Sequence, residues 1–257
     1  MKTMTRNNRQ QGLTLIEIMV ALVISLFLLA GLLQLFIGTR QSARIQENLS
    51  RVQENGRYAI DYLGRVIRLA GYRSRETIKR AETFEERFSS HLPIQYKTGS
   101  GEILTVIFEG ENTGQGEVRD CLNTLITSPP NPPVISTNTL KIDGNKLQCQ
   151  ANRIPTDAIN FPQQTQTVLE DVEAMEVLYG ENTDGDLLGV ADRYVSGPSV
   201  GDWKKVVSVR VSLLLRTAED NLAEAPQPYT FQESVITPND RRLRRVFTTT
   251  ITLRNRV

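Results

Sequence analysis

The sequence predicts an α+β protein in which one long N-terminal helix, first membrane-spanning and then amphipathic, packs on an antiparallel β-sheet domain. Three observations support this fold class: residues 13–38 are almost entirely apolar, residues 45–70 place apolar side chains at helical spacing, and much of the remainder alternates apolar and polar residues as strands do. The 257 residues are 39% hydrophobic and 23% charged, which is ordinary for one or two globular domains.

The apolar run 13–38 is long enough to cross a membrane as a helix. Its 26 residues would extend roughly 39 Å at about 1.5 Å per residue, against a hydrocarbon core about 30 Å thick. Glu17 is the only charged residue in the run, and a carboxylate within a membrane costs on the order of 2.5–3.5 kcal/mol. Glu17 is therefore a candidate functional residue. The simpler alternative is an acidic side chain that reaches back to the membrane surface.

The charges before this run predict its orientation. Residues 1–12 contain Lys2, Arg6 and Arg9 and no acidic residue. Positive residues before a first apolar span stay in the cytoplasm, so the chain after residue 38 should face outward. The whole chain has a net charge of only +1 and no dominant basic patch, so we expect no nucleic-acid partner.

The helix should continue beyond the membrane as an amphipathic segment. Apolar residues recur there at spacings of three, four or seven, which places them on one helical face: Ile45, Leu49, Val52, Ala59, Leu63, Val66 and Ala70. Gly71, in "LAGYR", is a plausible C-cap. We therefore predict one helix over 13–71, with 13–38 in the membrane, followed by an outward-facing β-rich domain over 72–257.

The outward part contains several strand candidates. Apolar or alternating runs occupy residues 103–108, 139–150, 175–180, 205–217 and 245–255. The run 139–150 is interrupted by Asp143, Gly144 and Asn145, which is a hairpin signal. Proline-rich and glycine-rich pieces such as "SPPNPP" at 128–133 separate the runs. These patterns predict one antiparallel sheet packed on the second half of the long helix.

The two cysteines, Cys121 and Cys149, both belong to the outward part. In an oxidising compartment a disulfide between them is the natural expectation, and in the chain-entropy model it would contribute roughly 3–4 kcal/mol. The alternative is two free thiols. A metal site is less suitable, because His91 is the only histidine and no CxxC motif occurs.

Catalytic motifs do not occur in the sequence. It contains no GxSxG, HExxH, P-loop or GxGxxG motif, and its single histidine, His91, lies in a stretch typical of a surface loop. The acidic pair Glu85 and Glu86 lies in a strongly charged stretch and is most simply a solvated helix face. We therefore expect a protein without enzymatic activity.

One loop partly resembles a calcium-binding loop. In "GENTDGDLLGVAD", Asn182, Asp184 and Asp186 occupy alternate positions, as the first three oxygen ligands do in calcium loops. Leu187 stands where such a loop needs glycine, and Arg193 stands where it needs a bidentate glutamate. The pattern therefore favours a polar turn between two strands, and we expect no cofactor or metal, with calcium as the weaker alternative.

The segment "QQGLTLIEIMVALVISLFLLAG" resembles the N-terminal signature of type IV prepilins. That signature has a basic leader ending in glycine, a hydrophobic residue after the cleavage point, and an acid at the fifth position after it. Here these residues are Gly12, Leu13 (where the family most often has phenylalanine) and Glu17. "YGENTDGD" and "RVFTTTITLRNR" are in addition similar to the PilW group of minor pilins.

The resemblance implies a processing pathway and a set of partners. Residues 1–12 would be a leader removed by prepilin peptidase, and Leu13 would then be N-methylated. The free α-amine of Leu13 would pair with Glu17 of a neighbouring subunit, which compensates two charges and fixes helix register. The implied partners are other minor and major pilins, the peptidase and the inner-membrane assembly platform. The protein would sit in the bacterial inner membrane with its C-terminal domain in the periplasm, and later in the pilus.

Together these points predict a minor pilin that takes part in type IV pilus assembly within an initiation or tip complex, a role that the family connects with twitching motility and cell adhesion. Loops over 110–135 and 217–240 would offer surfaces to a few neighbours. Two alternatives remain at this stage: a pseudopilin of a type II secretion system, and a signal-anchored periplasmic binding domain. An ordinary secretory signal fits poorly, because its apolar region is normally about 7–15 residues long.

Overall fold

The structure is a computed structural model. It describes residues 14–79, 92–97, 103–111, 117–127, 134–154, 163–184 and 189–255. The chain divides after Glu47 into two compact units, the first ending at Glu47 and the second running from Asn48 to Val257. The first unit contributes only helix to the described residues, whereas the second combines helix with all of the described strands.

Helix α1 (Leu15–Arg68) is continuous over 54 residues and belongs to both units. Within the second unit its predicted apolar face is buried, with Val52, Ala59, Leu63 and Val66 at most 5% exposed. Asn48, Gly56, Tyr62 and Ile67 are buried beside them, so the buried stripe is wider than the apolar pattern alone predicts. This stripe is the helical contribution to the hydrophobic core.

The end of α1 is fixed by the last described residues of the chain. Gly71 has a φ of +72°, and a Cβ at this position would lie 2.1 Å from the carbonyl oxygen of Asn255. The side-chain amide of Asn255 donates hydrogen bonds to the carbonyl oxygens of Arg68 (3.2 Å) and Ala70 (3.3 Å). The left-handed glycine that ends a helix therefore also makes room for the segment that caps it.

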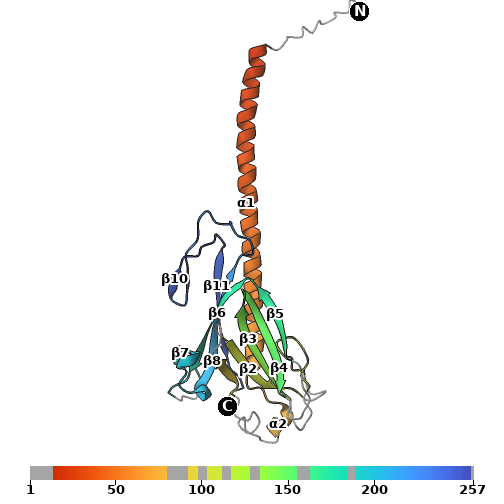
Figure 1. The fold of residues 1–257 in the computed structure, drawn as a ribbon, viewed down its shortest axis with the longest axis vertical. Helices are drawn as coiled ribbons and strands as arrows, with labels where there is room; N and C mark the ends of the chain where they lie inside the picture. The colour runs from red at the N-terminus through yellow and green to blue at the C-terminus, as the bar shows by residue number, and fades with distance from the viewer. Residues whose placement is uncertain are drawn as a thin grey trace, which may run out of the picture. The chain divides into compact units, whose positions relative to one another are not determined.

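One sheet is five-stranded and antiparallel, with its strands in sequence order (Figure 1). Its members are β1 (Ile94–Lys97), β2 (Ile103–Glu109), β3 (Ile135–Asp143), β4 (Lys146–Ile154) and β5 (Gln164–Glu170). The predicted hairpin joins β3 to β4, where Gly144 (φ 55°) and Asn145 (φ 62°) form a two-residue turn. Two consecutive positive φ angles match the twist of the flanking strands, which is why this sequence turns here.

The other main sheet has four antiparallel strands in the order β11, β8, β6, β7. Their bounds are β6 (Val172–Glu181), β7 (Arg193–Ser196), β8 (Val206–Arg216) and β11 (Arg244–Thr252). The connection from β8 to β11, which we predicted to be a loop, contains a two-stranded ribbon of β9 (Tyr229–Phe231) and β10 (Ser234–Ile236). Two 3-10 turns (Gly197–Ser199 and Trp203–Lys205) and a five-residue helix α2 (Arg75–Lys79) complete the described elements.

The prediction of a single sheet was wrong. β5 ends at Glu170 and β6 begins at Val172, so one residue, Asp171, separates the two main sheets. Asp171 has a φ of 59°, a left-handed conformation that aspartate tolerates better than most residues. Its carbonyl oxygen accepts a hydrogen bond from the Arg216 amide at the end of β8, which holds the redirected chain in the second sheet. A change of direction at one residue hardly alters the alternation of apolar and polar residues, so the sequence pattern did not indicate the break between the two sheets.

The core lies between α1 and the two sheets. Strand β8 contributes most to it, since Val209, Val211 and Leu213 are fully buried, as the alternation predicted. Leu104 and Leu140 of the five-stranded sheet are buried in the same cluster. The second half of α1 and both sheets therefore form one packed body.

Candidate functional site

The start of α1 is a polar end on an apolar helix. The Glu17 carboxylate accepts hydrogen bonds from the Thr14 amide and the Thr14 hydroxyl, both at 3.0 Å, and the Glu17 amide is 3.4 Å from the Thr14 hydroxyl oxygen. This reciprocal arrangement is a capping box, in which the side chains of Thr14 and Glu17 each accept a hydrogen bond from the other residue's amide at the helix start. Gly12 and Leu13 lie outside the described residues.

Thr14 is a residue that the sequence analysis missed. The spacing of Thr14 and Glu17 is the T-x-x-E pattern of a capping box, so the signal was present in the sequence. In the single chain, Glu17 therefore has a local role as a helix cap beside any role between subunits.

From Leu15 to Ile37 the first unit presents an apolar surface on every side. Seventeen large apolar side chains between Leu15 and Ile37 are between 49% and 77% exposed. The helix is long and apolar enough to cross a membrane, with a mean hydropathy of 2.7 over its most apolar 18 residues and none of that window buried. A water-exposed apolar surface of this size needs lipid or other helices to cover it.

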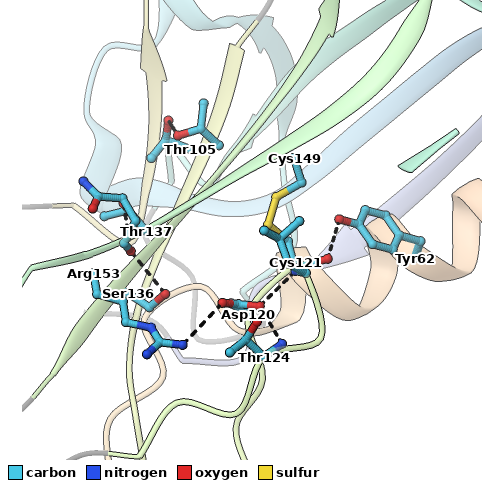
Figure 2. The surroundings of a disulfide bond; sticks show 12 residues. Tyr62, Thr105, Asp120, Cys121, Thr124, Ser136, Thr137, Cys149 and Arg153 are labelled. Carbon is cyan, nitrogen blue, oxygen red and sulfur yellow. Dashed lines mark hydrogen bonds and ion pairs between the residues drawn. A yellow bond between two sulfur atoms is a disulfide. The ribbon is translucent and has the colours of Figure 1, made fainter. Parts of the chain in front are cut away.

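The disulfide ties an irregular segment to the five-stranded sheet beside α1 (Figure 2). Cys121 and Cys149 are bonded, as expected, with their Cα atoms 6.3 Å apart. Figure 2 shows the Tyr62 side chain of α1 directed at this segment, where its hydroxyl donates a hydrogen bond to the Cys121 carbonyl oxygen at 2.9 Å. Burial raises the pKa of the Tyr62 hydroxyl, so it remains a donor at physiological pH.

Asp120, next to the disulfide, organises the same segment. Its carboxylate accepts hydrogen bonds from the amides of Leu122 (2.9 Å) and Thr124 (2.8 Å) and lies 3.9 Å from the guanidinium of Arg153 on β4. The Asp120 side chain is only 3% exposed, so its charge is compensated inside the protein. The segment around Cys121 is therefore held to the body by a covalent bond, a tyrosine and a buried carboxylate.

A second charged cluster, formed by Arg244, Glu173 and Asp240, lies on the four-stranded sheet. The Arg244 guanidinium of β11 donates to both carboxylate oxygens of Glu173 (2.7 and 2.8 Å) and to both of Asp240 (2.7 and 2.8 Å). These contacts to Arg244 hold the pKa of Asp240 down, to about 2. The cluster ties the long β8–β11 connection back onto the sheet, which is a structural role.

The candidate calcium loop is closed by its own hydrogen bonds. The Asp192 carboxylate accepts from the amide (2.6 Å) and hydroxyl (2.9 Å) of Thr183 and from the amide of Asp184 (3.3 Å). These bonds lower the pKa of Asp192. Asn182 and Asp184 are both present in this turn, whereas Asp186 lies outside the described residues. The described part is a turn held by hydrogen bonds to Asp192, and calcium binding stays a prediction to be tested.

Among the described residues, no group of three or more histidine, cysteine, aspartate or glutamate side chains is placed to hold a metal ion. His91, Glu85 and Glu86 fall outside the described residues. The features that stand out are instead an apolar helix with a capped acid and a stapled β-domain, an arrangement suited to assembly with other helices.

Two regions of the chain match models of known protein families. Residues 135–255, from β3 to the asparagine that caps α1, match the family model of the type IV pilus-assembly protein W, PilW. Residues 7–33 match the prokaryotic N-terminal methylation motif. Both resemblances predicted from the sequence are therefore confirmed, and they point to a structural protein. No curated protein matches this chain.

Two solved structures share parts of this arrangement. A type IV-like pilin from Thermus thermophilus is 17% identical, with a TM-score of 0.44, over 83% of this chain and 99% of that one. A chain of the GspK-GspI-GspJ complex from the type 2 secretion system of enterotoxigenic Escherichia coli is 12% identical, with a TM-score of 0.30, over 60% of this chain and 73% of that one.

Proposed function

We propose that this chain, with its N-terminal methylation motif and its pilus-assembly protein W region, is a minor pilin that takes part in type IV pilus assembly. The observation that carries the proposal is the conjunction of two features in one helix. Its first half exposes apolar side chains on all sides around a single acid, Glu17, and its second half packs into the core of a folded β-domain. A subunit whose helix first lies in a membrane and later packs against other helices needs an exposed apolar half and a half that is anchored in a folded domain.

Processing would begin at the boundary of the leader. We propose that prepilin peptidase cleaves between Gly12 and Leu13 on the cytoplasmic side and that Leu13 is then N-methylated. The basic residues Lys2, Arg6 and Arg9 keep that end in the cytoplasm, so residues 72–257 would fold in the periplasm. The Cys121–Cys149 disulfide is consistent with that oxidising compartment.

Glu17 would then change partners during assembly. In the single chain its carboxylate caps α1 through Thr14. Removing the leader creates a free α-amine at Leu13, and a neighbour's Glu17 offers it the opposite charge. Pairing two groups that are each costly in an apolar setting compensates both, and it fixes the stagger of adjacent helices. The assembly platform would receive the subunit from the inner membrane.

The protein would be scarce in the fibre and belong to an initiation or tip complex. Its β-domain carries two sheets and a ribbon on one helix, and repeating such a body at every position would crowd the filament surface. The pilus-assembly family match favours this role over that of a secretion pseudopilin. The fibre would also be the means by which the protein contributes to motility or adhesion.

The experiment that tests the proposal quantifies this chain in purified, sheared pili. We expect a copy number far below that of the main subunit, few fibres after deletion of the gene, and a mature N-terminus that mass spectrometry places at methylated Leu13. A copy number close to that of the main subunit would reject the minor role, and normal piliation without the gene would reject the priming role. A mature protein that begins at Met1 would reject the processing.

A further inference from the structure

Strand β5 is an edge strand with an open side. Among the described residues it pairs only with β4. The two-residue turn makes Asp143 and Lys146 a hydrogen-bonded pair, so the backbone N–H and C=O of Lys146 point toward β3. Along β4 these groups point alternately toward β3 and β5, and those of Cys149 therefore point toward β5. The backbone groups of Gln166, which lies opposite Cys149, point back toward β4. The next residue, Thr167, must then direct its backbone N–H and C=O away from the sheet, toward the open side.

This edge lacks the usual protection against pairing. From Gln164 to Leu169 its sequence is QTQTVL, with no proline and no charge. The edge strands of the other sheet carry arginines instead, Arg193 on β7 and Arg244 and Arg245 on β11. Charges and prolines on edge strands normally prevent the addition of another strand. On β5 the protective features are one bulge, opposite Leu147 and Gln148, and a single charge, Glu170, at the last residue of the strand.

A groove runs along the open side of β5, between the strand and α1. It consists of two hollows of about 620 and about 510 Å³ that share Thr167 and Val168 as lining residues. Between them, consecutive residues from Gln166 to Asp171 line the groove. Because successive side chains of a strand point to opposite faces, a groove lined by consecutive residues follows the strand's edge. The opposite wall is the second half of α1, from Asn48 to Arg68, together with Leu69 just after the helix.

The larger hollow has an excess of positive charge. Three arginines line it: Arg65 and Arg68 on α1 and Arg119 beside the disulfide. The only carboxylate in this lining is Asp120, which is nearly buried and already bonded to two amides and to Arg153. Arg119 is paired with Glu117 at 2.9 Å and Arg65 lies 3.6 Å from Asp61, but both carboxylates are largely exposed and lie outside the lining. Exposed ion pairs of this kind contribute little, so three guanidinium groups still face an incoming chain and favour a negatively charged occupant.

We infer that the edge of β5 is a docking site for an extended, acidic segment of a neighbouring subunit, which adds to the five-stranded sheet as a sixth strand beside α1. Main-chain hydrogen bonds to outward groups such as those of Thr167 would provide affinity, and Arg65, Arg68 and Arg119 would select acidic side chains. The inference rests on the proposed function, because it assigns to one surface of the β-domain the contact with a second pilin.

The test places a photo-crosslinking amino acid at Gln166, in the groove, within the full-length protein in piliated cells. A matched control places it at Thr252, which is exposed on β11, outside the groove. We expect Gln166 to give a cross-link to another pilin, and mass spectrometry to locate it in an extended segment containing aspartate or glutamate. We expect Thr252 to give little or none of this product.

Two pairs of variants test the two elements of recognition. Thr167→Pro removes the outward N–H, whereas Thr167→Ala keeps it; we expect only the proline variant to lower the Gln166 cross-link, by about tenfold. Arg68→Glu should lower it by about tenfold, while Arg245→Glu, on an exposed arginine of β11, should not. An intact Cys121–Cys149 bond and unchanged resistance to protease show that each variant is folded.

The outcomes separate this inference from the proposed function. A fibre that contains this chain but gives no Gln166 cross-link to another subunit overturns the docking site and leaves the minor-pilin role intact. A cross-link to a segment of this same chain, or to a helix of the partner, overturns it as well. Absence of the chain from purified pili overturns the proposed function itself. Equal cross-linking by Thr167→Pro and Thr167→Ala would rule out strand addition.

Discussion

Residues 15–47 and 48–68 of α1 belong to one unbroken helix, yet their side chains have opposite surroundings. A Cβ added at Gly31 or Gly38 would have no neighbour within 4 Å, whereas one at Gly56 would lie 2.3 Å from the ring of Phe247 on β11. The first half leaves its apolar surface uncovered, and the second half buries its apolar stripe in the core. The first half therefore depends on lipid or other subunits, while the second is stabilised within the chain.

The largest effect should follow loss of the disulfide. Replacing both Cys121 and Cys149 by serine should destabilise the second unit by about 3–4 kcal/mol, because the reduced chain gains the entropy of an open loop. Chemical denaturation, followed by the fluorescence of Trp203, measures this loss. Membrane insertion of the first half should not change. A matching loss of insertion would show that the two halves are not independent.

A smaller loss of stability should follow from adding a methyl group to the second half of α1 but not to its first half. Gly56→Ala should cost about 1–3 kcal/mol, because the new methyl group overlaps the Phe247 ring, whereas Gly38→Ala should be neutral or slightly stabilising. Thermal unfolding of the two variants makes the comparison, and Gly56→Ala combined with Phe247→Leu should recover part of the loss. Equal melting temperatures for Gly56→Ala and Gly38→Ala would contradict the close packing of the second half.

The smallest effect should be a pH dependence confined to the second unit. Contacts with Arg244 hold the pKa of Asp240 at about 2, below its usual 3.8, so the stabilisation is complete above about pH 4 and is lost as the pH falls through 2. The expected size is at most about 1 kcal/mol once solvent screening is allowed for. Asp240→Asn should flatten the stability profile between pH 4 and 2. An unchanged acid slope in this variant would remove Asp240 from the explanation.

The sequence predicted the parts of the fold that have strong periodicity. The buried face of α1 and strands β2, β6, β8 and β11 follow from apolar spacing, and the β3–β4 turn follows from Gly144 and Asn145. β5 was missed because its residues are polar and largely exposed, as an edge strand beside a groove allows. The separation into two sheets was missed because it depends on one backbone angle, at Asp171.

Some residues of the candidate site could be predicted from the sequence, whereas the groove beside β5 could not. Glu17 and the two cysteines could be identified because an acid in an apolar run and a pair of outward cysteines are each rare features. The groove beside β5 joins residues from α1, from the disulfide segment and from the sheet. Residues so far apart in sequence are brought together only by tertiary packing, and no local pattern indicates their proximity.

The most direct test of the contrast between the two halves compares Glu17→Ala with Thr14→Ala in pili and in membranes. Thr14→Ala removes the hydroxyl contacts of the helix cap but keeps the carboxylate, whereas Glu17→Ala removes the charge proposed to pair with a neighbour's amine. We predict that both variants insert into the inner membrane and fold normally. We predict that Thr14→Ala enters pili near the wild-type level and Glu17→Ala falls below about a tenth of it. Wild-type incorporation of Glu17→Ala would contradict the claim that the first half acts through contacts between subunits.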